Sequence, residues 1–341
     1  MNTALQAGSS ADVSRPTEPD VAREFQALLS GCGVYDLSSR ARIRLTGSDR
    51  TRWLNGMVTN NIRDLAPNHG VYSFLLNAQG HIQADLYAYN LGESILVEAD
   101  GQLREKLLAD FDKFIIMDNV EIADQTGAGA AIGVAGPRAK AVLKSAGIEI
   151  PDIAPLELCT PRCDCDCGCP ACTAVHGDES LGESYEIWLA LDQKITSWDA
   201  LVKAGAVPVG ADAVEMLRIS RGVPRYGVDI RERDLPQETG QMRALNFTKG
   251  CYLGQEIVER IRSRGAVHRE FAAFEVDGPL PAAGTKIQAD EKDVGEVTSR
   301  AELPLPTGNR AIALGYRRRE AAGKVLHAGM AALNPATLPI I

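Results

Sequence analysis

The sequence predicts an α+β protein that ends in a small β-barrel. With 341 residues, the chain exceeds one compact core, so roughly two or three packed units are expected. Helical and strand-like patterns are mixed, and Asn77–Gly80 separates two strand-like runs as a hairpin turn would, which argues against a doubly wound parallel sheet. From about His268 onward, only short strand-like runs follow, separated by glycine and proline, as is typical of a small barrel.

In the first half of the chain, ordered structure is expected from Val21, after a polar, disordered leader over residues 1–20. Thr46–Asp49 supplies capping residues for one helix, and Pro137 suits the start of another. Helices are predicted over residues 21–29, 50–57, 102–111 and 138–145. Strands are predicted over residues 40–45, 70–77, 81–90, 94–98, 120–123 and 130–135.

The second half begins with a predicted strand over residues 186–191 and a helix over residues 195–204. The next helix, over residues 214–221, is ended by Gly222, with Pro224 shortly after. The strands expected in the barrel are residues 270–276, 286–289, 293–299 and 312–316.

Charge and hydropathy exclude several classes of protein. The net charge of -9 argues against strong nucleic-acid binding, and the basic run Arg317–Arg319 is interpreted as a solvated turn. No apolar stretch approaches the roughly 18 residues of a membrane span, and the polar N-terminus has no signal core. We therefore expect a cytoplasmic monomer, in which structural disulfides are not expected.

The stretch Lys249–Glu256 combines a thiol, an ammonium, a carboxamide and a carboxylate. Two glycines punctuate it, and the apolar residues that follow share one helical face, so Cys251 is predicted to lie in a loop that leads into a helix N-terminus. Helix potential and a neighbouring ammonium both lower the pKa of a thiol and favour the thiolate. The stretch is typical of a functional cysteine, although its spacing alone suits a small buried cysteine equally well.

Six of the eight cysteines lie in one window, at Cys159, Cys163, Cys165, Cys167, Cys169 and Cys172. Thiolate clusters bind metals, and the C-x-x-C spacing at its end suits zinc or an iron–sulfur cluster. The preceding C-x-C spacing is that of neither a zinc finger nor a ferredoxin, and only His176 could add a nearby ligand. The alternatives are a metal site, a tract that sequesters soft metals, or a surface loop with reduced thiols. The predicted metal ligands are Cys163, Cys165, Cys167, Cys169 and Cys172.

The stretch Lys249–Glu256 resembles the signature of YgfZ-type folate-binding proteins, which are relatives of the glycine-cleavage T-protein, an aminomethyltransferase. The other segments that resemble this family follow in the same order, at residues 46–49, 54–61, 77–86, 181–187, 217–219, 227–230, 235–238 and 293–299. The cysteine window resembles nothing in the family and looks like an insertion over about residues 157–175.

The resemblance implies a T-protein-like ring of mixed α/β subdomains around a tetrahydrofolate pocket, over residues 21–265, with the barrel over residues 268–341. It implies roles in the maintenance of iron–sulfur enzymes and in tRNA modification. The implied working thiol is Cys251, tuned by Lys249. Glu186 resembles the pterin-binding glutamate, because a carboxylate can accept two hydrogen bonds from the pterin edge. The other residues expected to bind folate and line its pocket are Gln255, Glu256, Tyr252, Arg218 and Asp85, with helix capping as an alternative for Glu256.

One departure from the T-protein pattern bears on catalysis. Near the position of Asp85, T-proteins carry two adjacent acidic residues. The first of the two, taken as the catalytic carboxylate, corresponds to Ala84 in this chain. Asp85 could substitute, but a shift of one residue along a strand turns a side chain to the other face. We therefore expect a tetrahydrofolate-binding accessory protein for iron–sulfur enzymes. The alternatives are a folate-dependent one-carbon transferase and a metal-binding scaffold.

Overall fold

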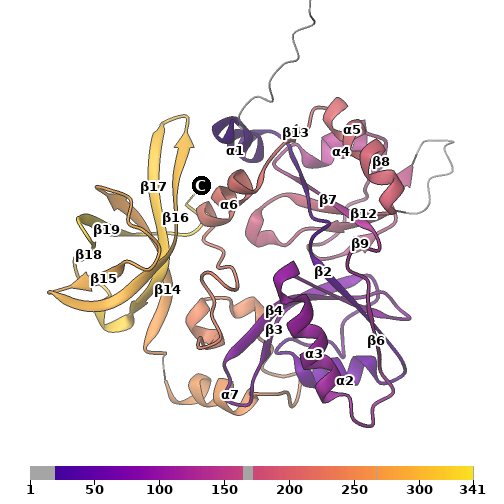
Figure 1. Ribbon diagram of the computed structural model, residues 1–341, viewed down its shortest axis with the longest axis horizontal. Coiled ribbons are helices and arrows are strands. Elements are labelled where there is room, and N and C mark those ends of the chain that lie inside the picture. Colours follow the sequence, from indigo (N-terminus) through magenta and orange to yellow (C-terminus); the bar gives the residue numbers. More distant parts are fainter. Residues whose placement is uncertain (1–19, 164–171, 266, 341) are drawn as a thin grey trace, which may run out of the picture.

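The computed structural model describes residues 20–163, 172–265 and 267–340. A five-stranded sheet, a six-stranded sheet and a closed barrel surround the centre of the molecule (Figure 1). Helices and largely antiparallel strands are mixed along the chain up to the barrel. The predicted α+β class with a C-terminal β-barrel is therefore confirmed.

The five-stranded sheet is antiparallel, in the order β3–β4–β5–β2–β6. Its strands are β2 (Ala41–Thr46), β3 (His69–Leu76), β4 (Ile82–Asn90), β5 (Ile95–Ala99) and β6 (Glu121–Asp124). Helices α2 (Arg50–Met57) and α3 (Arg104–Phe114) bury their apolar side chains, including Trp53 and Phe111, in a single core with one face of this sheet. The opposite face is left to contact the rest of the molecule.

The six-stranded sheet has the order β13–β1–β7–β12–β11–β9, and within it β1 and β13 run parallel. Its strands are β1 (Gly33–Asp36), β7 (Ala130–Ala135), β9 (Leu158–Cys159), β11 (Thr173–His176), β12 (Ser184–Leu189) and β13 (Val207–Pro208). Helices α4 (Ala139–Ser145) and α5 (Lys194–Lys203) pack on its outer face. A short pair, β8 (Ile148–Glu149) and β10 (Arg162–Cys163), lies beside this sheet.

The two sheets meet through their inner faces. Along β12, Ile187 joins the core beneath α4 and α5, whereas Glu186 and Trp188 point the other way because side chains alternate along a strand. The ring of Trp188 meets Tyr89 of β4 edge-on, with 5.2 Å between the ring centroids. Polar side chains of both sheets are thereby brought to one interior region.

The barrel closes in the order β14–β17–β16–β15–β18–β19. Its strands are β14 (Arg269–Asp277), β15 (Lys286–Ala289), β16 (Lys292–Leu305), β17 (Gly308–Arg318), β18 (Leu326–Ala328) and β19 (Ala331–Ala336). The sequence pattern did not predict β18 and β19, and β16 and β17 are longer than predicted. Short strands are stabilised by pairing at closure, which local sequence does not encode.

Helices α1 (Val21–Ser30) and α6 (Ala211–Ser220) connect the barrel to the six-stranded sheet, since Phe25, Leu217 and Leu314 share one buried core. The chain then forms two short 3-10 turns, η4 (Pro236–Thr239) and η5 (Met242–Ala244), before α7 (Gln255–Arg264). Helix α7 reaches the tip of the β3–β4 hairpin (Figure 1). Among the described residues, each helix is too short or too polar to cross a bilayer.

Candidate functional site

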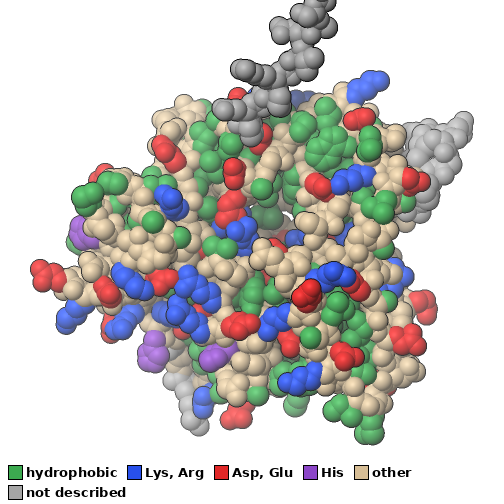
Figure 2. Space-filling view, in the orientation of Figure 1, with side chains coloured by type: hydrophobic (Ala, Val, Ile, Leu, Met, Phe, Trp, Pro, Cys, Tyr) green, Lys and Arg blue, Asp and Glu red, His purple; other side chains and the backbone are tan. Residues whose placement is uncertain are grey.

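A cavity of about 220 Å³ lies at the junction of the five-stranded sheet, the six-stranded sheet and α6; we call it the central cavity. Figure 2 shows a hollow near the centre of the molecule, bordered by acidic and basic side chains. The cavity is lined by Tyr35, Arg40, Tyr72, Asp85, Leu86, Tyr87, Ala99, Asp100, Leu181, Val214, Glu215, Leu217, Arg218, Val223, Pro224, Arg225, Tyr226 and Arg243. Aromatic rings, arginines and a few carboxylates dominate this lining.

Asp85, and not residue 84, faces the central cavity. Ala84 is fully buried in the core beneath α2 and α3, while Asp85 points to the opposite face of β4 and accepts a hydrogen bond from the Tyr72 hydroxyl at 2.9 Å. Burial raises the pKa of this carboxyl. The expectation that Ala84 marks the lost catalytic position is therefore corrected, because a carboxylate at residue 84 would be directed into an apolar core.

Tyrosines form much of the cavity wall. The rings of Tyr72 and Tyr87 lie 5.1 Å apart, and burial raises the pKa of both. The buried hydroxyl of Tyr226 has no hydrogen-bond partner among the described residues. An unsatisfied buried hydroxyl costs stability, so Tyr226 is a donor or acceptor available to a ligand.

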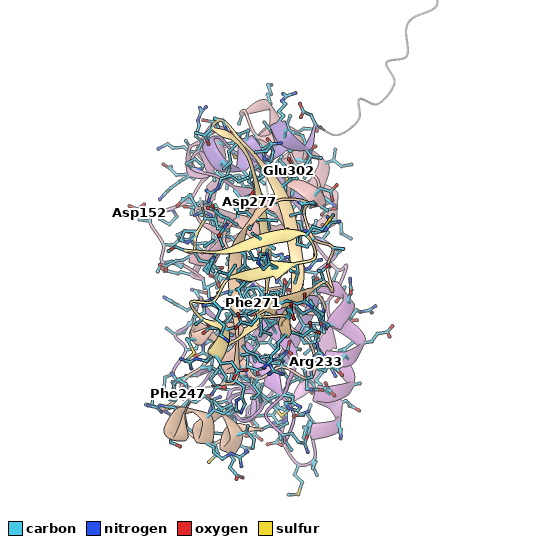
Figure 3. All side chains as sticks on the ribbon, turned by 90° about the vertical axis from the view of Figure 1, so that its left-hand side faces the viewer. Asp152, Arg233, Phe247, Phe271, Asp277 and Glu302 are labelled. Carbon is cyan, nitrogen blue, oxygen red and sulfur yellow. The ribbon has the colours of Figure 1, made fainter. Side chains whose placement is uncertain are left out.

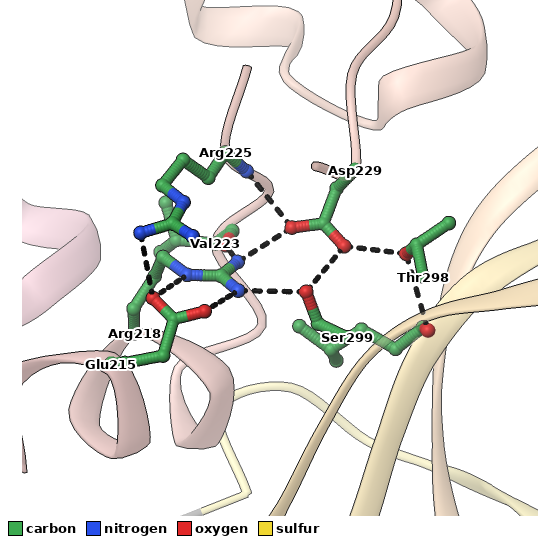
Figure 4. A network of polar contacts seen from close by, with 8 residues as sticks. Glu215, Arg218, Val223, Arg225, Asp229, Thr298 and Ser299 are labelled. Carbon is green, nitrogen blue, oxygen red and sulfur yellow. Dashed lines mark hydrogen bonds and ion pairs between the residues drawn. The ribbon is translucent and has the colours of Figure 1, made fainter. Parts of the chain in front are cut away.

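Arg218 lines the cavity, but its hydrogen-bonding capacity is fully used (Figure 4). A guanidinium has five N–H donors, and here they contact both oxygens of Glu215, the Val223 carbonyl, Asp229 and Ser299. The ion pair with Asp229 measures 2.7 Å. Arg218 therefore fixes the cavity wall, and direct binding of folate would require it to give up a buried partner.

Glu186 lies behind the cavity in a cluster of buried and half-buried charged side chains. Its Oε2 accepts a hydrogen bond from the Trp188 indole at 3.0 Å. Burial and the neighbouring carboxylate of Glu98 raise the pKa of Glu186 to about 7. Glu98 itself is fully buried and pairs with Arg40 at 2.6 Å and with Arg42 at 2.9 Å. Among the described residues that line the central cavity, Arg40 is present and Glu186 is not. Glu186 therefore influences the cavity through the charge of Arg40.

A second cavity, of about 430 Å³, adjoins the first and shares Tyr72 and Arg243 with it. The guanidinium of Arg243 lies 4.3 Å from the centroid of the Tyr72 ring and pairs with the buried carboxylate of Asp178. The Tyr87 hydroxyl donates to the same carboxylate at 3.3 Å. These residues form a polar partition between the two cavities.

The Lys249–Glu256 stretch forms a loop anchored away from the central cavity. The buried ammonium of Lys249 donates to the carbonyls of Asn55 and Val58 at the end of α2, and burial lowers its pKa to about 7. The backbone N–H of Leu253 donates to Gly56 at 3.0 Å. Lys249 is thus placed to hold the loop against α2.

The rest of the stretch completes this anchor. Tyr252 is buried, Gln255 accepts a hydrogen bond from the Tyr252 backbone at 3.3 Å, and Glu256 is exposed in the first turn of α7, where a carboxylate is favourable. Among the described residues, none of these three lines the central cavity, so the structure does not bring them to it, and their role in folate binding stays a prediction. Cys251 is exposed at the surface of the loop.

The cysteine window is only partly described. Cys165, Cys167 and Cys169 lie outside the described residues, as does the side chain of Cys163. Cys172 is half-buried and packs against the core beneath α4 and α5. A metal site in this window stays a prediction.

Sequence reasoning missed the Tyr72–Asp85 pair, Tyr226 and the Arg243–Asp178 partition. Strand alternation over residues 81–90 contained the signal for Asp85, since Ala84 and Leu86 fit an apolar face. The other contacts join segments that are distant along the chain, and no local pattern encodes them.

Comparison with known proteins agrees with this architecture. Residues 6–249 match the GCVT N-terminal domain, and residues 269–339 match the CAF17 C-terminal beta-barrel domain. An aminomethyltransferase of Rubrobacter xylanophilus is 29% identical over 304 residues, which are 88% of this chain and 80% of that protein. A chloroplastic putative transferase of Arabidopsis thaliana is 25% identical over 87% of this chain and 68% of its own.

The glycine cleavage system aminomethyltransferase T of Bartonella henselae has a similar solved structure, with a TM-score of 0.83 and 21% identity over 94% of this chain and 89% of that chain. This likeness shows the fold. The match to the GCVT model covers most of the chain, and the observed sheets and barrel have the corresponding arrangement. The chain therefore belongs to the GCVT family of aminomethyltransferase-like proteins and ends in a CAF17-type β-barrel.

Proposed function

We propose that this protein binds a tetrahydrofolate in the central cavity. The observation that carries the proposal is the composition of the lining, in which Asp85 and the unpartnered hydroxyl of Tyr226 lie among aromatic rings and arginines. Aromatic faces suit the flat rings of a folate, and a guanidinium suits its carboxylates. Family membership supports the same ligand. The residues present therefore fit the group.

Three parts of the wall would hold different parts of a folate. Tyr72 and Tyr87 offer ring faces, while Asp85 offers an acceptor for an N–H group of the ligand. The glutamate tail requires cations, and Arg225 and Arg243 are the most exposed arginines of the lining. Glu186, through the buried Glu98–Arg40 pair, would set the charge behind this site.

The test is calorimetry of the full-length chain with tetrahydrofolate. Val214→Trp fills the cavity from α6 and should abolish binding, whereas Val202→Trp makes the same change at a more exposed position on α5 and should bind normally. Circular dichroism checks that both variants fold. Absence of binding to the unaltered protein would reject the proposal.

We further propose that the folate-loaded protein serves iron–sulfur enzymes, including tRNA-modifying ones, through Cys251. The arrangement of the loop supports this role, since Lys249, Tyr252 and Leu253 anchor it and Cys251 is left accessible. A surface thiol can reach a partner protein, whereas a thiol in the cavity would reach only the bound ligand.

Complementation of a deletion strain tests this second part. Cys251→Ser should fail to restore iron–sulfur enzyme activity while it keeps the affinity for tetrahydrofolate, and Cys32→Ser, at a buried cysteine outside the cysteine window, serves as the cysteine control. Full restoration by Cys251→Ser would show that the thiol is not needed.

Folate-dependent one-carbon transfer is the second candidate, favoured by the position of Asp85. A tetrahydrofolate supplies nitrogen atoms that accept one-carbon units. A carboxylate whose pKa burial has raised can hold or release a proton beside such a nitrogen, and Tyr72 fixes its orientation. Asp85→Asn should then abolish methylene-tetrahydrofolate formation from an aminomethyl donor, measured by absorbance, with folate binding retained. If the unaltered protein forms none of this product, the candidate is rejected.

A further inference from the structure

A basic groove runs along one end of the barrel, away from the central cavity. It consists of two cavities, of about 430 Å³ and 500 Å³, which share Arg318. Figure 2 shows Lys and Arg side chains gathered on this side of the molecule, and Figure 3 shows Arg233 below Phe271 at the same end of the barrel. The groove is lined by Arg233, Val267, His268, Arg269, Lys286, Asp293, Val294, Gly295, Glu296, Tyr316, Arg317, Arg318, Arg319 and Glu320. None of these residues lines the central cavity.

The charge of the groove is opposite to that of the chain. Its lining contains six Lys and Arg residues and three Asp and Glu residues, while the whole chain carries a net charge of -9. One of the three acids, Glu296, is already neutralised by Arg231 at 2.8 Å and Lys286 at 2.7 Å. Arg317 is paired with Glu270 at 2.9 Å, so the excess positive charge of the groove comes mainly from Arg233 and Arg318.

Part of this positive charge is held rigidly. Arg269 pairs with Asp234 at 2.5 Å and Glu238 at 2.9 Å, and its guanidinium lies 4.8 Å from the centroid of the Tyr316 ring. In contrast, Arg233 and Arg318 have side chains that are 62% and 61% exposed. Their nearest ion-pair contacts measure 4.0 Å and 3.3 Å, so both are available to a ligand at little cost.

Tyr316 gives a second, independent indication of a ligand. Its side chain is only 4% exposed, it lines the 430 Å³ cavity of the groove beside Arg233 and Arg269, and its buried hydroxyl has no hydrogen-bond partner among the described residues. Leaving a buried hydroxyl unsatisfied is unfavourable, and an oxyanion in the groove would remove this penalty. The hydroxyl and the guanidinium groups are the donors that a phosphate oxygen accepts from.

We propose that this groove binds an anion with two or more phosphate groups. The two cavities share Arg318, and the exposed Arg233 and Arg318 together offer more guanidinium donors than one phosphate needs. Two sources share this chemistry, namely a small polyphosphate ligand and the backbone of an RNA. Arg317 and Arg318 end β17 and Arg319 begins a 3-10 turn, so only part of the run that was interpreted as a solvated turn lies in one.

The test uses calorimetry of the full-length chain with inorganic tripolyphosphate and, separately, with a structured RNA, each at about 50 mM and 200 mM salt. The unaltered protein should bind at least one probe, more weakly at the higher salt. The double variant Arg233→Glu, Arg318→Glu should lose on the order of tenfold or more in affinity. Arg52→Glu reverses an exposed charge on α2, far from the barrel, and should bind as the unaltered protein does.

Tyr316→Phe separates a binding role from a structural one. If the hydroxyl serves a ligand, this variant should bind several-fold more weakly and be no less stable to heat than the unaltered protein, since it removes an unsatisfied group. Binding of tripolyphosphate without RNA identifies a small ligand, and binding of RNA without tripolyphosphate identifies a nucleic acid. Binding of neither probe, or an equal loss in Arg52→Glu, overturns the proposal.

Discussion

Replacement of Asp229 by asparagine tests how the barrel supports the wall of the central cavity. The Asp229 carboxylate is fully buried and accepts four hydrogen bonds (Figure 4). One oxygen accepts from Arg218 at 2.7 Å and from the Arg225 backbone at 3.0 Å, and the other accepts from the hydroxyls of Thr298 and Ser299 on β16. A single carboxylate thus joins α6, the loop that carries Tyr226, and the barrel.

The magnitude follows from this geometry. Asparagine keeps one oxygen and replaces the other by an NH2 group, so the Thr298 and Ser299 hydroxyls would have to turn from donating to accepting, and Arg218 would lose its buried negative partner. Breaking a buried ion pair costs about 3–5 kcal/mol. The lower end applies here, because Glu215 still pairs with Arg218 at 2.6 Å. We expect Asp229→Asn to lower the free energy of unfolding by about 3 kcal/mol.

The assay is urea denaturation followed by tryptophan fluorescence and far-ultraviolet circular dichroism. The three tryptophans, Trp53, Trp188 and Trp198, all precede the barrel, so fluorescence reports on the sheets and circular dichroism on the whole molecule. Asp64→Asn alters an exposed carboxylate and should leave both transitions unchanged. A loss below about 1 kcal/mol for Asp229→Asn, with unchanged tetrahydrofolate affinity, would refute the reasoning.

Three further changes test other parts of the structure. Glu186→Gln should remove a pH dependence of stability. The raised pKa of the Glu186 carboxyl stabilises the folded protein at pH values below the pKa of the unfolded chain, and this contribution is lost as the pH rises through about 7. Thermal unfolding should therefore show that the variant gains about 1–3 kcal/mol relative to the unaltered protein between pH 5 and pH 8. Lys249→Met leaves two carbonyls at the end of α2 without their ammonium donor and should cost about 2–4 kcal/mol in urea denaturation. Gly254 has a φ of +81°, and Gly254→Ala would place a Cβ 2.5 Å from the Asn77 carbonyl oxygen. This variant should lower thermal stability and change the rate at which Cys251 reacts with iodoacetamide.

Much of the fold could be predicted because its signals are local. The hairpin around Asn77–Gly80, the helix over Arg50–Met57 and the apolar strand Ala130–Ala135 each follow from turn residues or hydrophobic pattern within a few positions, although the expected capping residue Asp49 makes no side-chain cap hydrogen bond to that helix. The last two barrel strands escaped prediction because they are short and gain stability from pairing with β14 and β15. Their formation is a property of closure.

The candidate site was predictable only in part. The sequence drew attention to Asp85, Arg218 and Glu186, and the first two line the central cavity. The sequence could not show that all five N–H donors of Arg218 are engaged, or that Asp85 lies on the face of β4 that lines the central cavity. Both facts depend on partners from other segments of the chain. The eight-residue stretch that stood out most in the sequence turned out to anchor a surface loop.

The sequence by itself determined the α+β class, the C-terminal barrel and the family resemblance, because hydrophobic periodicity and turn chemistry act over short separations. Only the tertiary structure decided which side chains share a space. It brought Tyr72, Tyr226 and Arg243 to one cavity and left Cys251 at the surface. The reason is physical: burial, charge pairing and unsatisfied hydrogen bonds depend on distances between segments far apart along the chain, and those distances exist only once the chain has folded.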